Sequence, residues 1–173
     1  MRKIFMTVCF MVVMVALSAC GDVVTSPGAT PVATQSGEQA SQQRSLKVGQ
    51  QGMLDGFAVK VNSVKETRGE DFDKISLKAG QVYIVLNVTI DNTGPESKNV
   101  SSLAQFALRD ASGQEYTEEY LSTAKKAPDG ILLSDHVLAG DLVYKVPTAE
   151  KMFTLIFQAA FLGSDQMTWD INV

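Results

Sequence analysis

Residues 81–92 read QVYIVLNVTIDN, and this stretch decides the fold class. Two sets of side chains alternate along it, which is the period of a β-strand with one buried face. The turn-forming residues Asn92-Thr93-Gly94-Pro95 follow directly. We therefore expect a half-buried strand that ends near residue 92. Its predicted inward side chains are Val82, Ile84, Leu86, Val88 and Ile90, and its predicted outward side chains are Tyr83, Val85, Asn87, Thr89 and Asp91.

Two neighbouring stretches predict further strands. Residues 57–65 show the same alternation, with Val64 slipping out of phase at the end. Residues 106–109 and 115–116 flank Asp110-Ala111-Ser112-Gly113, and an Asp in first place with a Gly in fourth is typical of a type I turn. This pattern predicts a β-hairpin.

The C-terminal third continues in the same way. Residues 142–146 alternate until Pro147, residues 153–161 are mostly apolar, and residues 167–173 alternate again. Residues 117–135 are ambiguous, because residues 120–126 are also compatible with a helical turn. About seven or eight strands in residues 47–173 predict an all-β fold, an antiparallel two-sheet sandwich.

The first twenty residues predict export. After Arg2 and Lys3, residues 4–17 are apolar except for Thr7. These 14 residues suit the apolar core of a signal peptide, whereas a membrane-spanning helix needs about 17–25. Residues 17–20, Leu-Ser-Ala-Cys, resemble the bacterial lipobox. The resemblance implies a lipid on Cys20 and cleavage between Ala19 and Cys20. A signal peptide without lipidation and an uncleaved anchor remain as alternatives.

A flexible tether is expected between this signal and the folded domain. Residues 21–46 are rich in Gly, Ser, Thr, Ala, Gln and Pro and contain no aromatic side chain. Such a segment buries too little apolar surface to offset the entropy lost on ordering. A chain of this length reaches about 25–30 Å. The predicted organisation is a signal peptide at 1–19, a lipidated Cys20 with its tether to residue 46, and a sandwich at 47–173.

Composition excludes several classes of protein. The chain has 15 basic and 19 acidic side chains, so it lacks the basic excess of a nucleic-acid-binding domain. Two cysteines are too few for a disulfide-dense scaffold or a four-cysteine zinc site. After the predicted cleavage, 13 basic and 19 acidic side chains would remain, a net charge of −6.

No catalytic constellation is evident, so we do not expect an enzyme and expect no cofactor. His136 is the single histidine and adjoins Asp135. It could act as a general base or metal ligand, but an exposed loop residue before a strand is the favoured interpretation. The acidic residues 70–73 could hold calcium, although Ile75 occupies a position that the EF-hand spacing needs for a ligand. A solvated loop is favoured there, and likewise for Glu118 and Glu119.

Four motifs resemble those of a bacterial family. They read GFAVKV at residues 56–61, YIVLNVTIDN at 83–92, FALRDASGQEY at 106–116 and GDLVYKVP at 140–147, the last followed by LIF at 155–157. Their order is similar to that of the immunoglobulin-like extracellular domain of unknown function found in bacterial lipoproteins and related to a mycobacterial immunoprotective antigen. The resemblance implies an immunoglobulin-like sandwich outside the cytoplasm and no catalytic residues. The family usually has a Pro-Gly turn where this chain has Leu133-Ser134-Asp135.

We therefore expect a non-catalytic binding module of the cell envelope. Its lipid on Cys20 would hold it on the extracytoplasmic side of the cell membrane. Another envelope protein is the expected partner, and residues 117–139, the longest irregular stretch, are the expected contact surface. The alternative is an extracellular domain that binds a small molecule or calcium through the acidic loop around Asp71.

Overall fold

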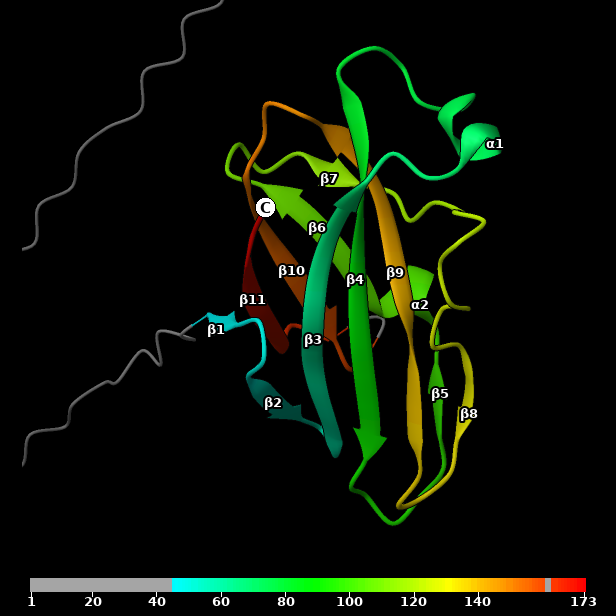
Figure 1. The fold of residues 1–173 in the computed structure, drawn as a ribbon. Helices are drawn as coiled ribbons and strands as arrows, with labels where there is room; N and C mark the ends of the chain where they lie inside the picture. The colour runs from blue at the N-terminus through cyan, green and yellow to red at the C-terminus, as the bar shows by residue number, and fades with distance from the viewer. Residues whose placement is uncertain (1–44, 161–162) are drawn as a thin grey trace, which may run out of the picture. The chain divides into compact units, whose positions relative to one another are not determined.

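The protein folds into a sandwich of antiparallel sheets, seen in a computed structural model that describes residues 45–160 and 163–173 (Figure 1). The first sheet has the strand order β1-β11-β10-β6-β7, and the second sheet has the order β2-β3-β4-β9. A small third sheet pairs β5 with β8. The first sheet comprises β1 (Leu46–Lys47), β6 (Phe106–Asp110), β7 (Glu115–Tyr116), β10 (Met152–Gln158) and β11 (Gln166–Asn172). The second comprises β2 (Gln51–Leu54), β3 (Phe57–Thr67), β4 (Gln81–Asn92) and β9 (Val137–Pro147), and the third β5 (Lys98–Val100) and β8 (Gly130–Leu132).

Strand β4 forms the centre of the second sheet, as its sequence predicts. It pairs with β3 on one side and with β9 on the other, both antiparallel. All five predicted inward side chains are buried. The predicted hairpin is also present, because Leu108 pairs with Tyr116 and the amide of Gly113 donates to the carbonyl of Asp110.

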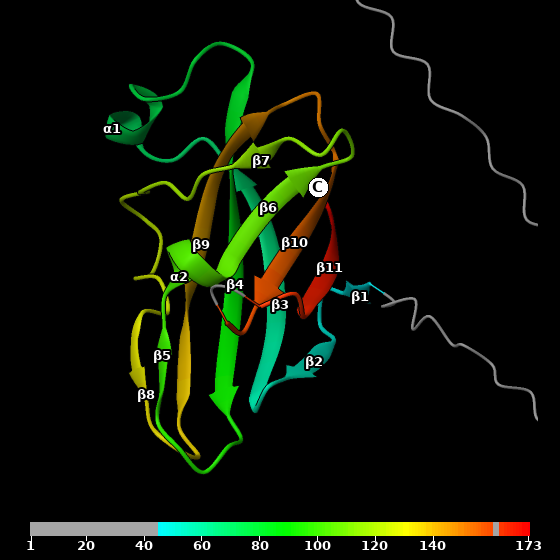
Figure 2. The ribbon, with the colours of Figure 1, turned by 180° about the vertical axis from the view of Figure 1, so that it is seen from behind.

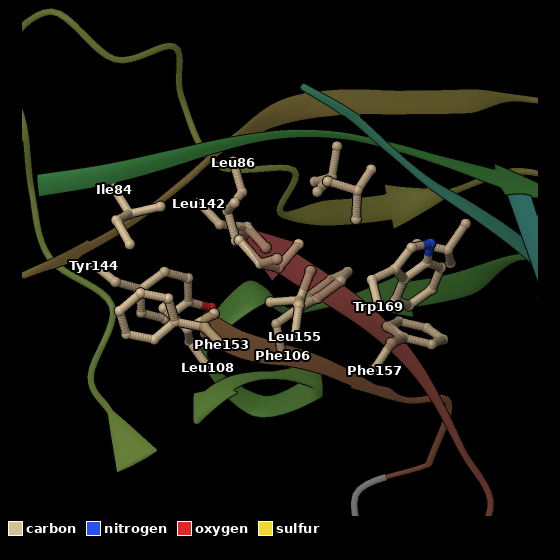
Figure 3. Close-up of a cluster of buried hydrophobic side chains, with 14 of the residues drawn as sticks. Ile84, Leu86, Phe106, Leu108, Leu142, Tyr144, Phe153, Leu155, Phe157 and Trp169 are labelled. Atoms are coloured by element: carbon tan, nitrogen blue, oxygen red, sulfur yellow. The ribbon is translucent and has the colours of Figure 1, made fainter. Parts of the chain in front are cut away.

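The core lies between the two large sheets (Figure 3). Trp169 of β11 and Phe157 of β10 are fully buried there and face side chains of the second sheet such as Leu86. The ring of Phe157 packs edge-on against Phe57 at 5.5 Å between centroids. Each large apolar side chain buried in this way contributes about 1.5–3 kcal/mol to folding. The phenylalanines at 153 and 157 and Trp169 are therefore core residues, whereas Phe161 lies outside the described residues.

A β-bulge explains why Val64 falls out of phase. The pairing of β3 with β4 passes from Val61 opposite Val88 to Ser63 opposite Asn87, which leaves Asn62 as an extra residue. A bulge shifts the alternation by one position. Val64 thereby returns to the inner face and packs against the core.

Two segments change from one sheet to the other. Leu46 pairs with Trp169 in the first sheet, and a few residues later Gln51 pairs with Lys60 in the second. On the far side, β7 ends in the first sheet and Glu118 forms a bridge to Tyr144 of the second. Figure 2 shows these two places from behind. The pair β1 and β11 is parallel, the one departure from the antiparallel pattern within the described residues.

Short elements complete the domain. Two single-turn helices, α1 (Asp71–Lys74) and α2 (Ser102–Gln105), were not expected from the sequence. Residues 120–126 form a turn closed by the Ala124 amide and the Leu121 carbonyl, not a helix. At the position of the family's usual Pro-Gly turn, Asp135 has φ 57°, a conformation that Asp tolerates better than most residues.

The predicted signal peptide, Cys20 and the tether to residue 44 lie outside the described residues. Leu46, at the predicted end of the tether, already pairs with β11. Residues 45–160 and 163–173 contain no helix that is long and apolar enough to span a membrane.

Candidate functional site

Residues 117–129, here called the strap, lie along the edge of β9. In Figure 1 they form the yellow-green loop between β7 and β8. The amide of Glu119 donates to the Val143 carbonyl at 2.8 Å, next to the bridge between Glu118 and Tyr144. The ammonium of Lys145 lies 3.5 Å from the Glu119 carboxylate. The strap therefore covers part of a strand edge that would otherwise be free.

A second, smaller apolar cluster holds the strap on the outer face of the second sheet. Leu121 of the strap packs with Tyr83 and Val143, and Ala124 and Val85 lie at its margin. Tyr83 is 1% exposed, although the alternation placed it on the solvent side. The prediction of a half-buried strand is thus correct for most of β4. It is wrong for the first few residues of the strand, where both faces are covered.

A buried carboxylate joins the strap to α1. Asp73 accepts hydrogen bonds from the Ser122 amide at 3.0 Å, the Ser122 hydroxyl at 2.6 Å and the Glu70 amide at 3.0 Å. The Ser122 hydroxyl is the main cause that lowers the pKa of Asp73 below its usual value. Residues 70–73 are therefore a capped helical turn with a buried anchor, and the expectation of a fully solvated loop is wrong for Asp73.

These contacts bear on the calcium alternative. Both carboxylate oxygens of Asp73 are engaged within the protein, and Asp71 pairs with Lys74 at 2.9 Å on the surface. In the described part of the chain, no three His, Cys, Asp or Glu side chains are grouped as metal ligands would be. The acidic loop thus serves to cap α1 and to fix the strap.

The strap also passes close to the backbone of β9 at Gly140. A β-carbon at this position would lie 2.8 Å from the Pro128 nitrogen and 2.9 Å from the Ala127 carbonyl carbon, and closer still to the Lys126 carbonyl oxygen. Only a residue without a side chain fits there. The glycine of the motif at residues 140–147 therefore permits the strap to cross the strand.

A row of polar side chains leads across the second sheet to the strap. Asn62, the bulged residue, donates to Asn87 at 3.0 Å, and Asn87 donates to Asp141 at 2.6 Å. The other carboxylate oxygen of Asp141 accepts from the Lys125 amide at 2.8 Å. The bulge in β3 and the strap are thus linked through three side chains.

Between the strap and α2 lies a hollow of about 470 Å³, here called the strap pocket. Apolar side chains form much of its wall, among them Leu103, Tyr120, Leu121 and Val143. The lining also includes four carboxylates and two lysines: Glu118, Glu119, Asp129, Asp141, Lys125 and Lys126. Residues 117–139, the predicted contact surface, therefore supply much of the lining of the strap pocket.

Glu118 is the least satisfied of these carboxylates. Its side chain is half-buried, and burial is the main cause that raises the pKa of Glu118, while the Ser102 hydroxyl opposes the rise. Its Oε2 atom is buried and has no hydrogen-bond partner. The hydroxyl of Tyr144 is also buried without a partner. The expectation that Glu118 is solvated is wrong, whereas Glu119 is exposed as expected.

Several large apolar side chains in the predicted contact segment are exposed. Tyr120 is 77% exposed and Leu103, across the strap pocket, is 71% exposed. Ile131, Leu133 and Val137 are also more than half exposed and follow in the chain. Four of the ten large exposed apolar side chains in the described residues thus belong to residues 117–139.

The remaining candidate residues lie apart from the strap pocket. His136 is exposed in the turn before β9, and its Nδ1 atom lies 2.8 Å from the Ser134 carbonyl oxygen. This is the loop position that the sequence favoured. Ala19 and Cys20 lie outside the described residues.

Solved structures share the fold. The candidate lipoprotein ycdA from Bacillus subtilis matches with a TM-score of 0.58 and 23% identity over 70% of this chain. This chain spans only 38% of that ycdA chain. The yjhA protein from Bacillus subtilis matches with a TM-score of 0.56 and 18% identity, over 74% of this chain and 98% of that chain. The secreted protein MPT63 from Mycobacterium tuberculosis matches with a TM-score of 0.55 and 15% identity, over 76% of this chain and 99% of that one.

The family comparison agrees with the resemblance seen in the motifs. No curated protein matches the chain. A family model described as a domain of unknown function, DUF4352, matches residues 46–168, which is most of the chain and nearly all of the sandwich. This match confirms the predicted family resemblance, and the likeness to the mycobacterial secreted protein confirms the fold. The chain belongs to the DUF4352 family.

Proposed function

We propose that this protein is a lipid-anchored component of the cell envelope whose sandwich binds another envelope protein through residues 117–139. The observation that carries the proposal is the exposure of four large apolar side chains within this segment, Tyr120, Ile131, Leu133 and Val137. Exposed apolar surface of this kind is enriched at sites of protein contact. Of these residues, Tyr120 also lines the strap pocket.

The sequence supports the anchor. Cys20 follows a lipobox-like Leu-Ser-Ala, and about 25 residues separate it from β1. Structures with the same fold include a candidate lipoprotein and a secreted protein, which supports a place outside the cytoplasm for this chain as well. Two or more acyl chains are needed for stable anchoring, and lipidation at this kind of site supplies them.

We also propose that the domain is not catalytic. His136 contacts a backbone carbonyl and not the hydroxyl or thiol of a nucleophile. A histidine that activates a nucleophile must lie within hydrogen-bond reach of it.

Substitution of the anchor residue tests the location. Cys20→Ala should abolish labelling by a radioactive fatty acid and move the protein from the membrane to the soluble extracytoplasmic fraction. Ser18→Thr, which keeps the cysteine, is the control for expression. A Cys20→Ala protein that still takes up the label would contradict the anchor.

Site-specific photo-crosslinking in intact cells tests the contact surface. A photo-reactive amino acid at Tyr120 or Ile131 should capture one discrete partner. The same amino acid at Met152, which is 63% exposed but lies in the first sheet, is the matched control. Equal capture from all three positions, or none from Tyr120 and Ile131, would exclude residues 117–139 as the contact surface.

A further inference from the structure

Helix α1 is inverted relative to an ordinary surface helix. Its carboxylate Asp73 is 4% exposed, whereas the apolar residues Phe72 and Ile75 are 73% and 81% exposed. Residues three positions apart share one face of a helical turn, so Phe72 and Ile75 form one apolar pair, here called the α1 tip. A surface helix usually turns its apolar side chains toward the core and its charges toward water. Packing of the domain alone does not account for this arrangement.

Several contacts hold the α1 tip in its outward position. The Asp73 carboxylate accepts two hydrogen bonds from Ser122, and the Asp73 carbonyl accepts one from the Tyr83 hydroxyl at 3.1 Å. A β-carbon on Gly69 would collide with Asp73 and Leu121, so the chain packs closely against the buried side of the turn. The apolar pair cannot turn inward without breaking these contacts.

The α1 tip lies at one end of the sandwich, as Figures 1 and 2 show from opposite sides. Strands β5 and β8 lie toward the other end, and β8 contains Ile131 of the proposed contact with an envelope protein. A surface that covers the α1 tip would therefore leave Ile131 accessible at the far end of the domain.

The charges around the α1 tip balance. Lys74 and Asp71 form an ion pair at 2.9 Å on the surface of the turn. The long stems of lysine and arginine let their charged heads stay in water while neighbouring apolar groups enter a less polar phase. A contact made here therefore depends on the apolar pair and not on net charge. Residues 68–78 contain three basic and three acidic side chains: Arg68, Lys74, Lys78, Glu70, Asp71 and Asp73.

The bilayer is the surface that an anchored domain always has within reach. About 25 residues separate Cys20 from β1, and a flexible chain of this length reaches about 25–30 Å. A domain of this size has a radius of gyration of about 14 Å, so the tether predicted from the sequence lets any face touch the bilayer. Contact with the membrane is then an intramolecular event, which even a small apolar surface can favour.

We propose that the α1 tip inserts Phe72 and Ile75 into the interface of the membrane that carries the lipid of Cys20. The insertion orients the sandwich with β8 directed away from the bilayer. This inference rests on the anchor in the proposed function and adds a second, non-covalent contact with the same membrane. A protein bound to the α1 tip is the competing occupant.

Quenching by lipid in vesicles tests the insertion. The full lipidated chain is reconstituted into phosphatidylcholine vesicles, with and without phosphatidylglycerol, in which part of the lipid carries bromine on its acyl chains. Phe72→Trp places an indole at the α1 tip, and Ile131→Trp, at a side chain that is 69% exposed, is the matched control. The parent protein gives the background, because Trp169 is buried in the core. The Phe72→Trp emission should be quenched and shifted to shorter wavelengths in both lipid compositions, and the Ile131→Trp emission should be unchanged.

A second pair of variants tests the apolar contact itself. Ile75→Ser, added to Phe72→Trp, should lower the ratio of inserted to free domain about tenfold, because one of the two apolar side chains is lost. Ile131→Ser, added to Phe72→Trp, should leave that ratio unchanged. Both serines replace exposed side chains, so thermal melting should show a folded domain in each case.

Four results would overturn the inference: unquenched Phe72→Trp emission in protein that sediments with the vesicles, equal quenching at positions 72 and 131, quenching unaffected by Ile75→Ser, or quenching that requires phosphatidylglycerol. Capture of a protein by a photo-reactive amino acid at position 72, with the indole there unquenched, would assign the α1 tip to protein docking. Wild-type protein that carries no lipid and stays out of the vesicles would overturn the anchor and this inference together. Sedimentation through the lipid without quenching would overturn this inference alone.

Discussion

Asp73 shows how one side chain organises a distant segment. It is 4% exposed and receives three hydrogen bonds, two of them from a residue 49 positions later in the chain. A carboxylate that accepts several donors remains ionised and holds those donors in fixed positions. The same residue caps α1, so it fixes both α1 and the strap.

Gly140 is a residue at which even the smallest side chain should strongly lower the stability of the fold. Gly140→Ala brings a methyl group against the strap backbone and should lower the free energy of unfolding by about 3 kcal/mol. Gly94→Ala is the control, because a β-carbon there meets only ordinary contacts of 3.4 Å or more, and its effect should stay within about 0.5 kcal/mol. Urea denaturation of both variants measures the difference. Equal losses of unfolding free energy in the two variants would mean that the strap does not pack closely against β9 at Gly140.

Asp110 makes part of the stability depend on pH. The Ser112 hydroxyl, followed by the Tyr116 hydroxyl, lowers the pKa of Asp110 from 3.8 to about 2. A carboxyl with a lowered pKa stabilises the fold fully above its unfolded value, and this contribution is lost as the pH falls from about 4 to about 2. Asp110→Asn should therefore show a smaller drop in melting temperature over that range than the wild type. An identical drop would show that the hairpin carboxylate does not contribute.

At the scale of elements, the bounds and inner face of β4 could be predicted because its alternation is long and its end carries turn residues. What the prediction missed is the cover over its first residues. Residues 82–86 are apolar on both faces, and a strand apolar on both faces is typical of one covered from both sides. That signal was present, and it indicates the site of the strap.

The strap itself could not be predicted as a structure. Its position depends on hydrogen bonds to Asp73 and Asp141 and on the space above Gly140, none of which follows a period in the sequence. Its irregular composition does indicate a surface segment, but it gives no sign of the strap pocket. The status of Glu118 depends on burial, which local sequence does not determine.

Pairing of the strap with β9 should protect that edge. Glu119→Pro removes the amide that donates to Val143 and should lower the free energy of unfolding by about 2 kcal/mol. The exposed edge should also promote self-association, which light scattering at increasing protein concentration would detect. Glu119→Ala keeps the amide and loses only a surface ion pair, so it should remain close to the wild type. If both variants behave alike, the backbone pairing is unimportant.

At the scale of the whole domain, the two large sheets are connected at both sides by segments that change sheets. Residues 46–54 do so on one side and residues 115–118 on the other. Sequence patterns predicted the longer strands of each sheet but not β1, β2 or the bridge at Glu118, because stretches this short show no period. The sandwich class was therefore predictable and the closure of its edges was not.

Removal of the first connection should weaken the whole domain. A fragment of residues 51–173 lacks β1 and the Gln50 carbonyl that accepts from the Trp169 indole at 3.1 Å. It should unfold with a free energy about 2–3 kcal/mol below that of a fragment of residues 45–173. Denaturation curves of the two fragments provide the comparison. Matching curves would show that β1 adds nothing to the sandwich.

Trp169 gives the domain an optical reporter. It is the only tryptophan of the chain, its indole is fully buried, and its nitrogen contacts the segment that joins β1 to β2. Indole emission shifts to longer wavelengths when water reaches the ring. The emission wavelength of the intrinsic fluorescence therefore reports whether the segment between β1 and β2 still covers Trp169. Detachment of this segment can thus be followed in the unlabelled protein, separately from events at the strap on the opposite side of the second sheet.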